Sequence, residues 1–98
     1  MRRIGRSEIE LLMKQGDDFV SVGDFSSARI LFGRIAEAGE ARGALALAAT
    51  YDPVALKKLG AVGVVPDLAK AQEWYRRAEE LGSAEAKSRL ETLADRPH

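Results

Sequence analysis

The chain has 98 residues, and its 15 acidic and 15 basic side chains leave no net charge. This length suits one domain over residues 1–98. Because there is no cysteine and the only histidine is His98, we expect no disulfide, no metal site, no cofactor and no catalysis by cysteine or histidine. The balanced charge argues against nucleic-acid binding, which depends on neutralising phosphates.

The apolar residues are distributed in short runs along the chain, and none approaches the roughly 20 residues of a membrane span. The basic start from Met1 to Arg6 leads directly into the sequence Ser7-Glu8-Ile9-Glu10 rather than into an apolar stretch. We therefore expect no export signal and a cytoplasmic protein. Residues 7–56 carry a net charge of −4, so the acidic bias lies in the first half.

The first helix is expected over residues 8–22. Ser7 would cap it, and Glu10 three residues later would complete a capping box. Gly23 interrupts this helix, and Asp24 is expected to cap a second one with an apolar stripe at helical spacing. Gly39 should end that second helix, because glycine readily takes the left-handed conformation that follows a helix.

A third helix is expected over residues 40–51, which are rich in alanine. Asp52 followed by Pro53 combines an N-cap with a proline at the first helical position, which predicts a short helix over residues 53–59. Residues 61–66 are few and interrupted by glycine, so we expect a packed loop rather than a core strand.

The remaining elements are two more helices. Asp67 is expected to cap a fifth helix that ends at Gly82, and a last helix should cover residues 83–94. Residues 1–6 and 95–98 are expected to be flexible ends. The predicted fold class is therefore all-α.

An internal repeat of 43 residues relates the second helix to the fifth. Residues 24–47 align with residues 67–90 with seven identities, among them Asp24 with Asp67. A helical repeat of this length indicates helix pairs stacked in series. Small side chains recur where paired helices must approach closely, and aromatic ones fill the space beside them. The small residues are Gly16, Ala28, Ala48 and Ala71, and the aromatic ones are Phe19, Phe32, Tyr51 and Tyr75.

Two sets of motifs resemble known helical repeats. The spacing Gly16-x2-Phe19-x8-Ala28-x3-Phe32 resembles a tetratricopeptide repeat. Residues 39–93 are similar to the related Sel1-like repeat. The resemblance implies an α-α superhelix, a short solenoid of about two helix pairs, that acts in protein interaction. It makes residues 52–66 an inserted connection, longer than that of the family. The Sel1-like pieces are Leu47-Ala48-x2-Tyr51, Gly63-Val64-x2-Asp67-x3-Ala71-x2-Trp74-Tyr75-x2-Ala78 and Gly82-x-Ala84-x-Ala86.

The last helix is similar to the first helix of a further pair. Its close-packing position holds Glu91, where the earlier pairs have Gly16 and Ala48. Because a charged side chain there would block a following helix, residues 83–94 are expected to cap the solenoid.

In the tetratricopeptide and Sel1-like folds, the first helix of each pair lines a concave face. Transferred by position, this resemblance predicts a face that is more acidic than basic and that would bind a basic or mixed peptide of a partner protein. The alternative is an ordinary solvated surface. The candidate residues are Glu10, Met13, Asp17, Val20, Arg42, Leu45, Ala49, Asp52, Glu85, Ser88 and Thr92.

The inserted connection is too apolar for a free loop. We favour its packing under the solenoid, and the alternative is an exposed patch for a partner or a second copy of the chain. Self-association, or docking on a larger assembly, is thus the alternative to a peptide-binding adaptor, because helical repeats usually need about three units for a continuous core. The apolar residues are Val54, Leu56, Leu59, Val62, Val64 and Val65.

Other candidate sites have simpler explanations. Trp74 and Tyr75 lie on a helical stripe with alanines, so we expect them in the core rather than in a cofactor or base-stacking site. Gly60-x2-Gly63 lacks the strand and the Lys-Ser/Thr pair of a phosphate-binding loop. Arg2, Arg3 and Arg6 are expected in a flexible terminus rather than on an acidic partner.

No convergent catalytic group is expected. The six serines have no histidine partner, and the adjacent carboxylates Asp17-Asp18 and Glu79-Glu80 point apart on a helix. General acid–base chemistry needs two groups that meet in a pocket. The sequence therefore predicts a protein that is not an enzyme.

Overall fold

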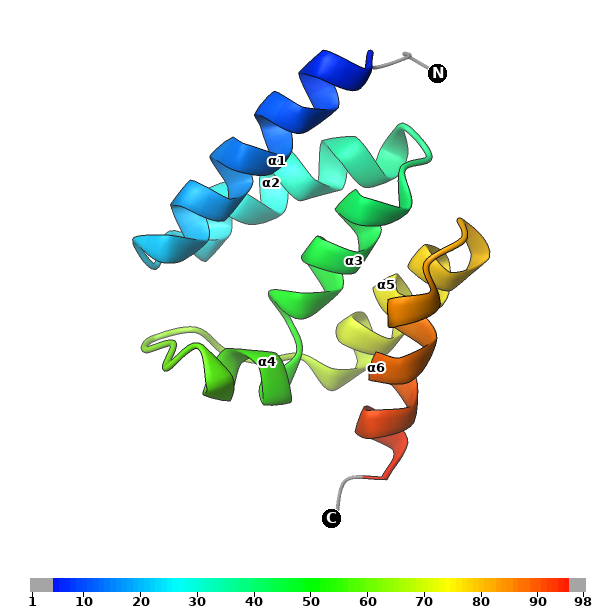
Figure 1. Ribbon diagram of the computed structural model, residues 1–98. Coiled ribbons are helices and arrows are strands. Elements are labelled where there is room, and N and C mark those ends of the chain that lie inside the picture. Colours follow the sequence, from blue (N-terminus) through cyan, green and yellow to red (C-terminus); the bar gives the residue numbers. More distant parts are fainter. Residues whose placement is uncertain (1–4, 96–98) are drawn as a thin grey trace.

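The computed structural model describes residues 5–95, and within that range the chain forms six α-helices and no strand. The predicted all-α class is confirmed. Figure 1 shows α1, α3 and α6 following one another across the front, with α2 behind α1 and α5 behind α6. The helices are α1 (Arg6–Ser21), α2 (Phe25–Glu37), α3 (Ala41–Ala49), α4 (Pro53–Lys58), α5 (Leu68–Glu80) and α6 (Ala84–Ala94).

Three helices begin at the predicted capping residues Asp24, Asp52 and Asp67, and a fourth, α6, is capped by Ser83. At α2, the Asp24 carboxylate accepts a hydrogen bond from the backbone N–H of Ser27 at 3.1 Å. The side chains of Asp52, Asp67 and Ser83 likewise accept hydrogen bonds from backbone N–H groups in the first turns of α4, α5 and α6. These bonds satisfy N–H groups that have no partner inside the helix.

The first helix begins earlier than predicted. Gly5 occupies the N-cap position of α1, no side chain caps the helix, and Arg6 is its first residue. The backbone N–H of Ile9 donates to the carbonyl oxygen of Gly5 at 2.9 Å, which places Ser7 inside the first turn. The predicted capping box at Ser7 is therefore wrong.

The ends of two other predicted segments also need correction. The flexible start is wrong for residues 5 and 6, while residues 1–4, including Arg2 and Arg3, lie outside the described part of the chain. Residues 96–98 lie outside it as well. Helix α3 ends at Ala49, two residues before the predicted end.

The helices pack in series, with α4 set aside. Helix α1 packs on α2, α2 on α3, α3 on α5 and α5 on α6. The core has two clusters of buried residues: one includes Ile9, Phe32 and Ile35, and the other includes Tyr75 and the alanines around it. Trp74 packs against both clusters. This order of contacts is what stacked helix pairs require, while the superhelical course remains a prediction.

Glycine permits two close helix contacts. A Cβ atom at Gly16 of α1 would lie 2.3 Å from Cε1 of Phe32 on α2, so no larger residue fits without a shift. This confirms the predicted close approach there. A second close approach, which we did not predict, lies at Gly43 of α3, where a Cβ would be 2.6 Å from the backbone nitrogen of Ala36.

Of the aromatic residues predicted to fill the space between paired helices, some are buried and one is exposed. Phe32 and Tyr75 are buried, and Tyr51 is half-buried. Phe19 is 36% exposed, so its predicted place in the core is wrong. The buried aromatic side chain at this end of the α1–α2 pair is Phe25, the first residue of α2.

The insertion leaves and re-enters the helical stack at one point. The backbone N–H of Asp67 donates to the carbonyl oxygen of Tyr51 at 2.9 Å, which brings its two ends together. A closed loop of this kind can be long at little entropic cost. Gly60 and Gly63 have φ angles of 67° and 76°, which only glycine adopts readily.

Candidate partner-binding groove

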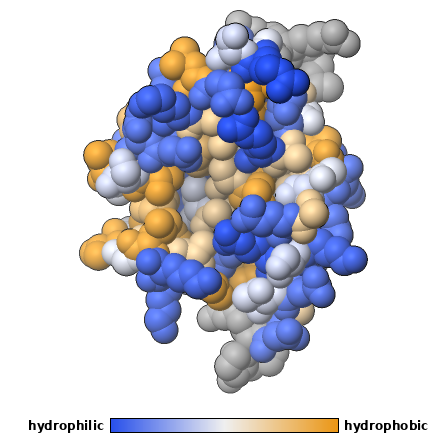
Figure 2. Space-filling model, viewed as in Figure 1, coloured by the Kyte–Doolittle hydropathy of each residue, from blue (hydrophilic) through white to orange (hydrophobic). Residues whose placement is uncertain are grey.

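An open groove crosses the face formed by α1, α3 and α6. Its volume is about 450 Å³. Figure 2 shows a hollow in the middle of this face, with tan and orange atoms inside it and blue atoms on its flanks. The groove therefore has an apolar floor between polar walls. It is lined by Met13, Asp17, Val20, Phe25, Phe32, Arg42, Leu45, Ala46, Ala49, Thr50, Leu59, Tyr75, Glu85 and Arg89.

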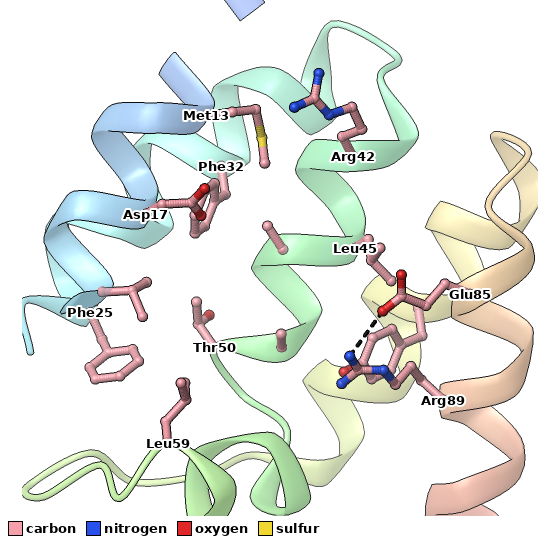
Figure 3. A pocket seen from close by; sticks show the side chains of 14 residues that line it. Met13, Asp17, Phe25, Phe32, Arg42, Leu45, Thr50, Leu59, Glu85 and Arg89 are labelled. Carbon is pink, nitrogen blue, oxygen red and sulfur yellow. Dashed lines mark hydrogen bonds and ion pairs between the residues drawn. The ribbon is translucent and has the colours of Figure 1, made fainter. Parts of the chain in front are cut away.

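The structure brings seven of the predicted face residues together in this groove. They come from α1, α3 and α6, the helices named for this role by the resemblance. Figure 3 shows Met13 and Asp17 extending from α1 toward α3, with Glu85 on the opposite wall. The seven residues are Met13, Asp17, Val20, Arg42, Leu45, Ala49 and Glu85.

Three further predicted residues lie outside the groove. Ser88 and Thr92 are exposed elsewhere on α6, and the Thr92 hydroxyl donates to the carbonyl oxygen of Ser88 at 3.1 Å. Helix α6 instead presents Glu85 and Arg89, which stand one turn apart on the same side. Glu10 lies beyond the groove, where its carboxylate pairs with Arg42.

Asp52 is the clearest correction among the predicted face residues. It is not on a solvent-facing surface but is only 2% exposed. Its Oδ1 accepts hydrogen bonds from the backbone N–H groups of Val54 and Ala55 at the start of α4. Its Oδ2 accepts a 2.6 Å hydrogen bond from the hydroxyl of Tyr75 on α5. The carboxylate is fully used inside the fold and cannot meet a partner.

The sequence predicted a face that is more acidic than basic, but the charges that line the groove are balanced, with two acidic and two basic side chains. Arg89 pairs with Glu85, with 2.9 Å between Nη2 and Oε2. Arg42 binds Glu10, which lowers the pKa of that carboxyl group through a hydrogen bond and through charge attraction. The Asp17 carboxylate is exposed and makes no hydrogen bond or ion pair with the described residues. Arg42 lies close enough to attract Asp17 electrostatically, but within residues 5–95 Asp17 is the one charged groove residue without a hydrogen bond or ion pair.

Sequence reasoning missed several lining residues. Phe25 and Phe32 belong to α2, whose position behind α1 the resemblance did not assign to this face. Leu59 comes from the insertion, and its apolar character was the signal that could have suggested it. Arg89 follows Glu85 by four residues on α6, a spacing that places both on one helix face.

A second hollow, here called the distal hollow, continues the groove toward the tip of the insertion. Its volume is about 470 Å³, and it shares Asp17, Val20, Phe25 and Leu59 with the groove. The rest of its lining comes from the α1–α2 turn and from residues 60–62. Together, the groove and the distal hollow form one channel from α6 to the insertion tip.

The insertion is packed at its base and exposed at its tip. Leu56 is buried, and Val54 and Val64 are half-buried. By contrast, Val62 is 91% exposed and Val65 is 82% exposed. The favoured expectation of a packed insertion therefore holds for α4 and fails for the loop that follows it. Leu59, at the junction, is also exposed.

Tyr75 is buried and Trp74 is half-buried against both core clusters, as expected for core residues. Trp74 also borders a hollow of about 410 Å³ between α2 and α5, on the side away from the groove, with charged neighbours such as Glu37 and Arg76. Most of the residues that line this hollow are charged, whereas most of those that line the groove are not.

Two further findings concern the described range. Within residues 5–95 no group of three or more His, Cys, Asp or Glu side chains is placed to hold a metal ion. No helix in this range is long and apolar enough to cross a membrane.

Searches against protein-family models, curated proteins and solved structures gave no match. The likeness to tetratricopeptide and Sel1-like repeats therefore rests on the sequence motifs alone.

Proposed function

We propose that this chain is a non-catalytic protein-interaction module that holds a polypeptide segment of a partner in the groove. The observation that carries this proposal is the apolar floor enclosed by α1, α3 and α6. Phe32, Ala46 and Ala49 contribute apolar surface to it, and Met13 and Leu45 flank it. Grooves of this kind bind by burying apolar side chains, while the charged flanks select the partner.

In this proposal, the groove recognises its partner by shape and charge. Its four charged side chains include two that pair with each other, Glu85 and Arg89, and one, Arg42, that pairs with Glu10. Among residues 5–95 every buried polar side-chain atom has a hydrogen-bond partner. The groove therefore presents an apolar floor flanked by charges that, apart from Asp17, are paired, which suits binding without bond rearrangement.

A groove-filling substitution tests this function directly. Ala49→Trp would place a large ring in the groove, and Ala69→Trp makes the same change on an exposed part of α5 away from it. Both variants are checked for folding by circular dichroism and applied to arrays of short synthetic peptides. We expect wild type and Ala69→Trp to bind the same peptides and Ala49→Trp to lose them. Equal binding by Ala49→Trp, or no binding by wild type, would contradict the proposal.

Self-association is a second candidate, supported by the exposed valines at the insertion tip. Val62 and Val65 are nearly fully exposed, and apolar tips of this kind are commonly covered by a partner or a second copy. Size-exclusion chromatography with light scattering decides between the two. A dimer at all concentrations that Val65→Asn converts to a monomer supports self-association, and a monomer throughout contradicts it.

A further inference from the structure

Within the described residues, the channel formed by the groove and the distal hollow has one charged side chain that makes no ion pair, and Arg42 attracts it only without direct contact. Arg42, Glu85 and Arg89 are each engaged in an ion pair, whereas Asp17 makes none with the described residues. In the distal hollow, Asp17 is the only charged side chain among the described lining residues. Asp17 lies where the two hollows join, because it lines both of them.

Apolar side chains line the same two hollows as this carboxylate. Val20, Phe25 and Leu59 line both hollows together with Asp17, and Val62 extends the apolar surface at the insertion tip. Figure 3 shows the Asp17 side chain directed into the groove and Leu59 approaching from below. An occupant that satisfies this surface needs one positive charge with apolar groups next to it.

We propose that the occupant is a polypeptide segment of a partner protein in which one lysine or arginine lies on Asp17 and an adjacent apolar side chain contacts Leu59 and Val62. This inference rests on the proposed function and adds the chemistry of the partner and a role for the insertion. Charge complementarity carries it, because Arg42, which attracts Asp17, is already paired with Glu10 and leaves the Asp17 carboxylate without a cation in direct contact among the described residues. A polypeptide fits because the channel runs from α6 to the insertion tip rather than ending in a closed pocket.

The charged contact contributes selectivity more than affinity. Asp17 is solvent-exposed, and ion pairs at exposed positions contribute little to binding on their own. Most of the affinity should come from apolar burial along the floor. Loss of the Asp17 charge is therefore expected to weaken binding of a lysine-centred peptide by about 1.5- to fivefold, not to abolish it.

Matched synthetic peptides provide the probe. A library of short peptides with leucine and valine flanks is made in three versions, with lysine, norleucine or glutamate at the centre. Binding is measured by fluorescence anisotropy. We expect wild type to bind the lysine version most tightly. If no lysine-centred peptide binds more tightly than its norleucine and glutamate counterparts, the inference is overturned.

Neighbouring residues supply the control for Asp17. Asp18 follows it on α1, but its carboxylate pairs with Lys14 at 3.1 Å and does not line the channel. Asp17→Asn should remove the preference for lysine, Asp18→Asn should keep it, and Asp17→Lys should transfer it to the glutamate version. Equal preference in Asp17→Asn and wild type would overturn the inference.

The insertion has its own matched pair. Val62 lines the distal hollow, whereas Val65, on the same loop and similarly exposed, does not. Val62→Asn should weaken peptide binding, and Val65→Asn should leave it unchanged. Equal effects of the two substitutions would remove the insertion from the binding surface and overturn that part of the inference.

The outcomes separate this inference from the proposed function. If Ala49→Trp abolishes peptide binding while Asp17→Asn changes nothing, the groove binds partners but the assignment of a basic residue to Asp17 is wrong. If no peptide binds wild type in either experiment, both the inference and the proposed function fail. A concentration-independent dimer that buries Val62 would identify a second copy of the chain as the occupant and overturn the inference.

Discussion

The hydroxyl group of Tyr75 donates a 2.6 Å hydrogen bond to Oδ2 of Asp52, and both side chains are buried. Oδ1 of the same carboxylate holds the first turn of α4 through the backbone N–H groups of Val54 and Ala55. One acidic side chain thus joins the base of the insertion to α5. Since Tyr75 also lines the groove, this pair fixes the insertion relative to the groove wall.

Tyr75→Phe removes the donor of this bond and leaves a buried carboxylate oxygen without it. We expect the free energy of unfolding to fall by about 1–3 kcal/mol, measured by urea denaturation. Tyr51→Phe is the control, because the Tyr51 hydroxyl makes no hydrogen bond within the described residues. The cation contact of its ring with Arg29 at 3.9 Å would persist with phenylalanine. Equal losses in the two variants would contradict a specific role for the Tyr75–Asp52 bond.

The same pair predicts a loss of stability at alkaline pH. Burial, and then the hydrogen bond to Asp52, raise the pKa of Tyr75 well above its ordinary value, although nearby Arg89 acts in the opposite direction. The unfolded chain ionises this tyrosine near pH 10, about its ordinary pKa, while the folded chain keeps it neutral. Its stabilising contribution is therefore complete below about pH 10 and is lost as the pH rises further.

Urea denaturation of wild type and Tyr75→Phe at a series of pH values measures this contribution, because the lysines and Tyr51 titrate in both proteins. The difference in unfolding free energy should be constant below about pH 10 and shrink above it. A difference that stays constant through the alkaline range would contradict the raised pKa.

Replacement of glycine by alanine is expected to have opposite effects on stability at two positions inside helices. Gly16→Ala would bring a Cβ atom to 2.3 Å from Cε1 of Phe32, and we expect a loss of about 1–3 kcal/mol in unfolding free energy. Gly33→Ala meets no atom within 4 Å and should stabilise α2 by about 0.5–1 kcal/mol. Thermal and urea unfolding of both variants check this. Stabilisation by Gly16→Ala would contradict the close contact of α1 with α2.

The cap of α2 is expected to contribute to the free energy of unfolding, and this contribution is expected to be lost in acid. The Ser27 hydroxyl and, less strongly, its backbone N–H donate to the Asp24 carboxylate and hold its pKa below the ordinary value. Because the folded pKa is lowered, this contribution is present above the pKa of the unfolded chain and disappears as the pH falls through the lower folded value. Asp24→Asn keeps a capping oxygen without the charge. Its free energy of unfolding should be lower than that of wild type at neutral pH, and this difference should disappear in acid. A difference that does not change with pH would contradict the lowered pKa.

Features set by neighbouring residues were predictable from the sequence. The caps at Asp24, Asp52, Asp67 and Ser83 depend on bonds within a single helical turn, so the local sequence is enough to find them. The prediction of Ser7 as a cap failed because Gly5 can cap the helix two residues earlier, and the local pattern does not decide between the two starts.

Features that depend on distant partners were not predictable. Asp52 was placed on a binding face because its position matched that of a face residue, but a tyrosine 23 residues away binds its carboxylate in the interior. Phe25 and Leu59 reach the groove only through the way α2 and the insertion pack around α1. The α1 and α3 residues of the groove were predicted by transferring positions from the resemblance to tetratricopeptide and Sel1-like repeats, and helical periodicity keeps such positions on one face.

A titration of the isotopically labelled protein with a lysine-centred peptide, followed by amide NMR shifts, tests the central claim most directly. The proposed mode of binding predicts shift changes that are largest at residues 13–20, 45–50 and 59–62, which line the channel. Residues 36–37 and 76–80, around the hollow on the opposite side, should change little. Changes confined to these residues, or absent from the channel at saturating peptide, would contradict the groove as the binding site.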